Sequence, residues 1–124
     1  MNYLLYFSRS NNPKNKKIMN TTENNKLIAE FMGSEKPEFA RINGALINIE
    51  NCAYQYSWDW LIPVVEKIEG MNWSTEMRYT SGIGHNFFFI SGGAELHRLR
   101  SSDTKIKATY RAVVEFIKWY NQQK

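Results

Sequence analysis

Three consecutive segments in the second half of the chain constrain the fold more than any other part. Residues 73–80 alternate apolar and polar side chains, which is the period-two pattern of a strand with one solvent-facing side. Residues 85–90 include three successive phenylalanines followed by isoleucine, and this run predicts a strand buried on both faces. Gly92-Gly93 predicts a tight turn into a third strand at residues 94–100. The three segments therefore predict an antiparallel meander.

The expected turns set the register of this meander. The first hairpin loop is expected to place Tyr79 opposite His85, and the glycine turn to place Phe88 opposite His97. Large apolar side chains then fall on both faces of the sheet. Because both faces need cover, we expect an α+β fold in which an antiparallel sheet, a meander of about three to five strands, packs between helices on both faces, with three helices in all.

The clearest of these helices is expected at residues 57–69. Either Ser57 or Asp59 can cap its first turn. Trp58 and Trp60 lie beside its apolar stripe, so we interpret them as core anchors, although a base-stacking platform is the alternative. The stripe occupies positions i, i+3, i+4 and i+7 and consists of Leu61, Val64, Val65 and Ile68.

The remaining elements are expected on either side of that helix. A first helix is predicted at about residues 22–32, and a last one from a Ser102 or Asp103 cap to about residue 121. Short strands are predicted at residues 39–42 and 44–49.

Length and composition predict a single domain with one core. The chain has 124 residues, of which 43% are hydrophobic. We expect the α/β sandwich domain to span residues 19–124, and residues 1–18 to be a basic N-terminal extension or tether. Deleting residues 1–18 is then expected to leave the melting temperature almost unchanged. No apolar run approaches the length of a membrane-spanning helix, and Cys52 is the single cysteine, so we expect a cytoplasmic protein without a disulfide.

The net charge of +4 is unevenly distributed. Residues 1–18 hold four basic residues and no acidic ones, which accounts for the whole net charge. Residues 19–95 carry five basic and ten acidic residues, whereas residues 96–124 carry seven basic and two acidic. The chain is dipolar, so any affinity for nucleic acid has to be local.

The sequence contains none of the common catalytic or phosphate-binding motifs. It lacks a Gly-x-x-x-x-Gly-Lys-Ser/Thr loop, a Gly-x-Gly-x-x-Gly fingerprint, a Gly-x-Ser-x-Gly elbow and a His-Glu-x-x-His helix. In the expected register His85 and His97 point to opposite faces, so they cannot share a metal ion or a proton. Cys52 is interpreted as a small buried hydrophobe. We therefore expect no enzyme activity, no cofactor and no metal site.

One constellation of side chains suggests binding. Lys107, Arg111 and Lys118 fall within about 40° of one another on a single helical face. Such a cluster suits a phosphate backbone or an acidic protein surface, and its alternative interpretation is an ordinary solvated face. The full set of candidate partner- or nucleic-acid-binding residues adds two arginines just upstream and a nearby lysine: Arg98, Arg100, Lys105, Lys107, Arg111 and Lys118.

Three stretches, in this order, resemble the phage ABA sandwich domain family of small phage and prophage proteins: residues 25–33, 57–69 and 112–121. The segment Ser-Trp-Asp-Trp-Leu that begins at Ser57 is the most specific part. The resemblance spans about residues 25–121 and implies a sheet between helical layers, but no activity and no catalytic or binding residues. The chain departs from the family pattern in its basic extension, and residues 34–55 do not match.

A phage setting favours a protein that acts by binding a host macromolecule. The most concrete hypothesis is an anti-CRISPR inhibitor of an RNA-guided Cas nuclease, acting in the host cytoplasm through contacts to the nuclease or its guide RNA. One alternative is a nucleic-acid-binding accessory protein, and another is a structural or scaffolding phage subunit. The expected partner is thus a host protein or ribonucleoprotein, with RNA as a further possibility and no membrane.

Overall fold

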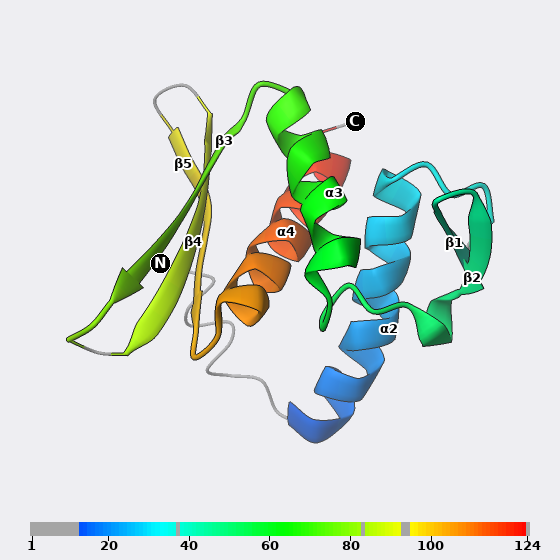
Figure 1. Ribbon diagram of the computed structural model, residues 1–124, viewed down its shortest axis with the longest axis horizontal. Helices are drawn as coiled ribbons and strands as arrows, with labels where there is room; N and C mark the ends of the chain where they lie inside the picture. The colour runs from blue at the N-terminus through cyan, green and yellow to red at the C-terminus, as the bar shows by residue number, and fades with distance from the viewer. Residues whose placement is uncertain (1–12, 37, 83, 93–94, 124) are drawn as a thin grey trace.

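The computed structural model describes the backbone of residues 13–36, 38–82, 84–92 and 95–123, and the side chains of residues 21–36, 38–82, 84–92 and 102–123. The fold is α+β with antiparallel sheets, as expected (Figure 1). Its elements in chain order are α2 (Pro13–Phe31), β1 (Phe39–Ile42), β2 (Ala45–Asn48), the short 3-10 helix η1 (Ile49–Asn51), α3 (Trp58–Gly70), β3 (Ser74–Thr80), β4 (His85–Gly92), β5 (Glu95–Ser102) and α4 (Lys105–Gln122).

Helix α4 forms the centre of the core. It packs against β4 and β5 of the three-stranded sheet and also against α2 and α3. The largest of its fully buried side chains is Phe116, whose ring meets Trp73 edge-on with centroids 5.0 Å apart and Phe31 with centroids 6.5 Å apart. A helix that is apolar around most of its circumference has to be buried in this way. Its buried residues are Ala108, Thr109, Tyr110, Ala112, Val113, Val114, Phe116 and Ile117.

The helices α2, α3 and α4 run in the same direction (Figure 1). Partway along α2, Asn25 accepts a hydrogen bond of 2.8 Å from the Tyr110 hydroxyl of α4. The Asn25 amide also donates to the Gln55 side chain, just before α3, at 3.0 Å. Toward the other end, the Lys67 ammonium of α3 donates to the carbonyl oxygen of Phe31, the last residue of α2. These contacts align the helices so that the first half of α2 extends past the starts of α3 and α4.

The sheet register differs from the expected one, by one residue between β3 and β4 and by two or three residues between β4 and β5. Thr80, not Tyr79, lies opposite His85. Ile90, not Phe88, lies opposite His97, and a register shift interrupts the β4–β5 pairing between Phe88 and Ile90. Strand β4 runs on through Gly92, which pairs with Glu95, so the connection is residues 93 and 94, outside the described part. Because side chains alternate along a strand, a slip of one residue exchanges the two faces.

The corrected register defines an inner face that packs on the helices. Phe88 and Ile90 are buried on this face, and Met77, which lies opposite Phe88, packs beside them. The layer arrangement differs from the expectation of helices on both faces, because the three helices of the described chain all lie on one side of this sheet (Figure 1). On the outer face Phe87 and Phe89 are only half-buried, and they stack on each other with ring centroids 6.4 Å apart. The aromatic residues of this face thus cover one another without a helix above them.

Strands β1 and β2 form a small hairpin whose turn residues are typical of a two-residue loop. Its two turn residues, Asn43 and Gly44, have φ angles of 50° and 86°, which are the left-handed values of a primed hairpin turn. Ala40 on β1 is fully buried, and the hairpin and η1 pack on α2. They carry the chain back so that α3 begins level with the middle of α2.

Several helix ends differ from the predicted ones. Ser57 is the N-cap residue of α3, although its side chain makes no capping hydrogen bond. Thr104 caps α4, in place of Ser102 or Asp103, and its side chain accepts from the Lys107 amide at 3.2 Å. Helix α2 starts at Pro13, well before the predicted residue 22, so the expected domain boundary at Met19 lies inside a helix. In the part of the chain that the structure describes, no helix combines the length and the apolar character that crossing a bilayer requires.

Candidate binding surface on helix α4

One face of α4 carries a narrow strip of exposed basic residues, which we call the α4 strip: Lys107, Arg111 and Lys118. All three are exposed, whereas Val114, which lies between Arg111 and Lys118 along the helix axis, is buried at 3%. At 1.5 Å per residue their backbones are spaced about 6 Å and about 10 Å apart along the helix axis. The cations stand on a helix that eight buried residues anchor to the core.

Two carboxylates lie beside the α4 strip. Lys107 is 3.7 Å from Asp103, and Lys118 is 3.8 Å from Glu115. A hydrogen bond from Ser102 and the charge of Lys107 both lower the pKa of the exposed Asp103 carboxyl, so this partner is ionised at neutral pH. Exposed pairs of this kind are worth between about 0 and 1 kcal/mol each, so a partner with stronger charges can replace them at little cost.

Lys105 lies apart from the strip, at the first residue of α4, and is exposed. It stands at the end of the molecule where α2 projects past the start of α4 (Figure 1). That projecting part of α2 contains Lys14, Lys16 and Lys17 in its backbone, although their side chains lie outside the described part. The described start of α2, residues 13–18, and the start of α4 thus lie at the same end of the molecule (Figure 1). The aligned helix N-termini add positive potential at that end.

The two remaining candidates, Arg98 and Arg100, belong to β5. Arg100 lies opposite Phe88, and Arg98 falls in the register shift between β4 and β5. Helix α4 packs on β5, so the backbone of both arginines borders the helix that carries the strip. Their side chains are outside the described part, and the structure therefore brings together three of the six candidates as one surface: Lys107, Arg111 and Lys118.

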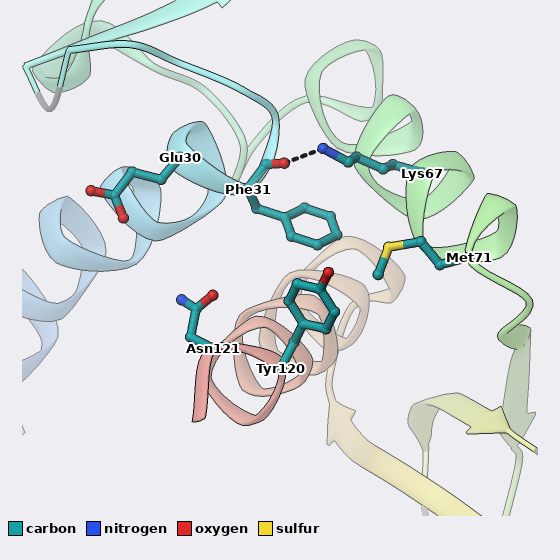
Figure 2. Close-up of a pocket in the computed structure, with 6 residues that line it drawn as sticks. All are labelled: Glu30, Phe31, Lys67, Met71, Tyr120 and Asn121. Carbon is teal, nitrogen blue, oxygen red and sulfur yellow. Dashed lines mark hydrogen bonds between the residues drawn. The ribbon is translucent and has the colours of Figure 1, made fainter. Parts of the chain in front are cut away.

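A groove lies where α2, α3 and α4 end. No sequence pattern predicts it. Its volume is about 340 Å³, and Figure 2 shows side chains from all three helices around it. The Lys67 ammonium sits 4.8 Å from the centroid of the Phe31 ring, and the Tyr120 ring meets Phe31 edge-on with centroids 5.8 Å apart. The lining residues are Glu30, Phe31, Lys67, Met71, Tyr120 and Asn121.

The role of Lys67 in this groove is structural. The last carbonyl groups of a helix lack partners within the helix, and they carry the negative end of the helix dipole. Lys67 donates to the Phe31 carbonyl oxygen at the end of α2 (Figure 2), so its charge is placed where the dipole favours a cation. One ammonium group and several aromatic contacts therefore hold the three helix ends together around the groove.

The remaining cysteine and histidine candidates lie in surroundings without catalytic or metal-binding partners among the described residues. Cys52 is buried at 4%, as expected, and burial raises the pKa of its thiol. Its sulfur donates to the Asn48 carbonyl oxygen at 3.5 Å. His85 is exposed at the start of β4. In the described part of the chain, no group of three or more histidine, cysteine, aspartate or glutamate side chains has an arrangement that could hold a metal ion.

The structure confirms the interpretation as a core anchor for one of the two tryptophans of the Ser-Trp-Asp-Trp-Leu segment and not for the other. Trp60 packs against the core, and its ring meets the buried Tyr54 edge-on with centroids 5.2 Å apart. Trp58 is 39% exposed and lies near Tyr56, which is 77% exposed. The two indoles of the Ser-Trp-Asp-Trp-Leu segment thus have different environments, because residues i and i+2 of a helix point about 160° apart.

Comparison with protein-family models, with curated proteins and with solved structures gives no match to this chain.

Proposed function

We propose that this protein is a non-enzymatic binding protein of the phage type whose partner is a host ribonucleoprotein, most concretely an RNA-guided Cas nuclease that it inhibits. The α4 strip is the observation that carries the proposal. Three exposed cations stand on one face of the central helix, and the resemblance to the phage ABA sandwich proteins supplies the cellular setting.

The charges of the surface favour a partner that is itself anionic. The strip together with Lys105 contributes four positive charges, and the neighbouring Asp103 and Glu115 offset two of them, which leaves a net +2. A positive field on one face of a small protein speeds its encounter with an anionic surface, in a manner that salt weakens. Guide RNA in a ribonucleoprotein presents such a surface, and so does an acidic patch on the nuclease.

The rigidity of α4 adds to the affinity. Eight buried residues fix the helix between the sheet and the other helices, so binding does not have to order the backbone under the cations. Only the side-chain rotamers of the strip lose freedom, which costs about 0.5–1.5 kcal/mol for each immobilised side chain. Inhibition then follows if the α4 strip occupies the guide RNA, or an acidic patch of the nuclease, that the complex needs in order to engage its target.

A pair of charge-matched variants tests the proposal. Lys107→Ala/Arg111→Ala removes two cations from the α4 strip, whereas Lys36→Ala/Arg41→Ala removes two exposed cations near the distant β1–β2 hairpin. Both variants have the same net charge. In a target-DNA cleavage assay with a panel of Cas nucleases, we expect wild type and the hairpin variant to block cleavage. The strip variant is expected to need at least about tenfold more protein, which corresponds to about 1.4 kcal/mol.

Two results would contradict the proposal. The first is complete cleavage by every nuclease in the panel in the presence of wild-type protein. The second is equal potency of the strip and hairpin variants, which would show that net charge and not the α4 strip matters. Extending the strip variant with Arg98→Ala, Arg100→Ala and Lys118→Ala asks whether the arginines of β5 belong to the same surface.

A nucleic-acid-binding accessory protein is the second candidate. It is favoured by the basic composition of the start of α2, whose backbone lies at the same end of the molecule as the start of α4 (Figure 1). This function predicts that free RNA or DNA binds without any protein partner. It also predicts that the logarithm of affinity falls linearly with the logarithm of salt concentration, with a slope of about −0.7 to −0.9 for each phosphate contacted. A flat salt response excludes it.

A further inference from the structure

Among the described residues, no strand pairs with the outer edge of β3, which is long and regular. The order of the three-stranded sheet is β3-β4-β5, and within the described residues β3 pairs with β4 alone (Figure 1). All seven residues from Ser74 to Thr80 pair with β4 without a register shift, and none of them is proline. An edge of this kind carries a row of unpaired backbone N–H and C=O groups that can template another strand.

Charged residues normally protect such an edge, but here their placement makes the edge complementary to itself. Glu76 and Arg78 flank Met77, the central residue of β3. If a second copy pairs antiparallel about Met77, positions at equal distances on either side of Met77 face each other. Glu76 then lies opposite Arg78 of the second copy, and Arg78 lies opposite its Glu76. Opposite charges directly across an antiparallel pair are stabilising, whereas like charges are destabilising.

The side chains of this pair are already held on the outer face. Within one chain the Arg78 guanidinium donates to both carboxylate oxygens of Glu76, at 2.8 and 3.3 Å. The guanidinium also lies over the Phe89 ring, 4.9 Å from its centroid, on the outer face of the sheet. In the pairing with a second copy, the two ion pairs lie side by side about the two-fold axis, and each charge has an opposite charge as its neighbour along the strand and across it. The result is a network of four alternating charges, the arrangement in which exposed ion pairs contribute most.

The inner face of β3 also gains from this pairing. Tyr79 is 58% exposed, an unusual state for a large aromatic residue on a sheet. In the symmetric register it lies opposite Thr75 of the second copy, and Met77 lies opposite Met77. Aromatic and β-branched side chains placed opposite each other stabilise antiparallel strands. Both faces of the strand therefore support the same register.

We propose that the partner of the β3 edge is a second copy of this chain. The two copies pair through β3 about a two-fold axis at Met77 and form one antiparallel sheet of six strands, with the helices of both copies on the same side. This contact is isologous, so it closes after two copies and does not propagate into a fibre. The inference stands on β3 alone and does not depend on the function proposed for α4.

Charge reversal and its rescue test this dimer. Wild-type protein is expected to change from monomer to dimer with rising concentration in sedimentation equilibrium. Glu76→Arg places like charges opposite each other at both pairs, and so does Arg78→Glu. Each single variant is expected to raise the dissociation constant of the dimer about tenfold or more. The doubly reversed variant, Glu76→Arg with Arg78→Glu, keeps the pairing within the chain and is expected to dimerise like wild type.

A mixture of the two single variants gives the decisive arm. One carries only cations at the two positions and the other only carboxylates, so they are expected to form a heterodimer although each alone is monomeric. Circular dichroism checks that each variant is folded. The inference is overturned if wild type stays monomeric up to its solubility limit, or if it dimerises and the reversals have no effect. Failure of the doubly reversed variant and of the mixture to dimerise overturns it as well, as does hydrogen exchange that shows the β3 edge amides protected in the monomer.

Discussion

Replacing Tyr110 by phenylalanine tests the hydrogen-bonded relay that aligns the three helices. The Tyr110 hydroxyl donates to Asn25 Oδ1 at 2.8 Å, and Asn25 in turn donates to Gln55. Asn25 is 2% exposed, so water cannot replace the lost donor. Tyr110→Phe keeps the ring and leaves a buried amide oxygen without this bond. Leaving one buried polar partner unsatisfied costs about 1–3 kcal/mol, so we expect a loss of that size in the free energy of unfolding.

Tyr54 supplies a control with the same chemical change and a different expected result. Its side chain is 1% exposed, and its hydroxyl has no hydrogen-bond partner among the described residues. Tyr54→Phe removes a buried polar group that gains nothing in return, so we expect no loss of stability, or a gain of up to about 1 kcal/mol. The two variants bury nearly the same apolar area. Their difference therefore isolates the hydrogen bond.

The measurement is urea unfolding followed by tryptophan fluorescence, because Trp60, Trp73 and Trp119 all pack against the core. A double-mutant cycle with Asn25→Ala completes the test. We expect the Tyr110–Asn25 coupling to be about 1 kcal/mol or more, since hydrogen-bonded neighbours are not additive. The reasoning is refuted if Tyr110→Phe and Tyr54→Phe change the free energy of unfolding equally, or if the coupling is zero.

Three further predictions concern the core and the pH. Phe116→Ala removes a fully buried ring from the contacts between α4, α2 and the start of β3, and urea unfolding is expected to show a loss of about 3–5 kcal/mol. Gly92→Ala places a methyl group 2.7 Å from Trp73, so we expect a loss of about 1–3 kcal/mol, whereas Gly82→Ala meets nothing within 4 Å and is expected to change stability little; equal effects would contradict the packing. Burial raises the pKa of both buried tyrosines above the ordinary value of 10.0. Above that pH the unfolded chain loses the protons that the folded chain keeps, so stability is full below pH 10 and falls as the pH rises further, by up to about 1.4 kcal/mol per pH unit for each tyrosine. Urea titrations between neutral and alkaline pH measure this slope, and Tyr110→Phe is expected to reduce it.

Part of the candidate surface could be predicted because its geometry is local. The separations between Lys107, Arg111 and Lys118 fix their common face on any helix, and all three are exposed. The neighbouring carboxylates, Asp103 and Glu115, were not predicted. They stand three or four residues from the lysines, so the same helical spacing predicts them too. The groove at the helix ends could not be predicted, because it requires three helices to end together. The self-complementary charges of β3 acquire meaning only once β3 is known to be an edge.

The sequence by itself determined the elements and their buried sides. Helical and strand periodicities report on one element at a time, which is why the stripe of α3 is buried as predicted and the strands lie near their expected positions. The Asn43-Gly44 pair is likewise a local signal, because its left-handed turn depends on these two residues alone.

The tertiary structure decided the register, the layers and the direction of the helices. A one-residue difference in a hairpin loop exchanges the two faces of a sheet, and no local pattern in the strands fixes that difference. Phe87 and Phe89 read as core in the sequence, but stacking on each other and on Arg78 lets them remain half-exposed. The parallel alignment of α2, α3 and α4 depends on contacts between residues far apart in the chain, such as Asn25 with Tyr110, and these contacts exist only in the folded protein.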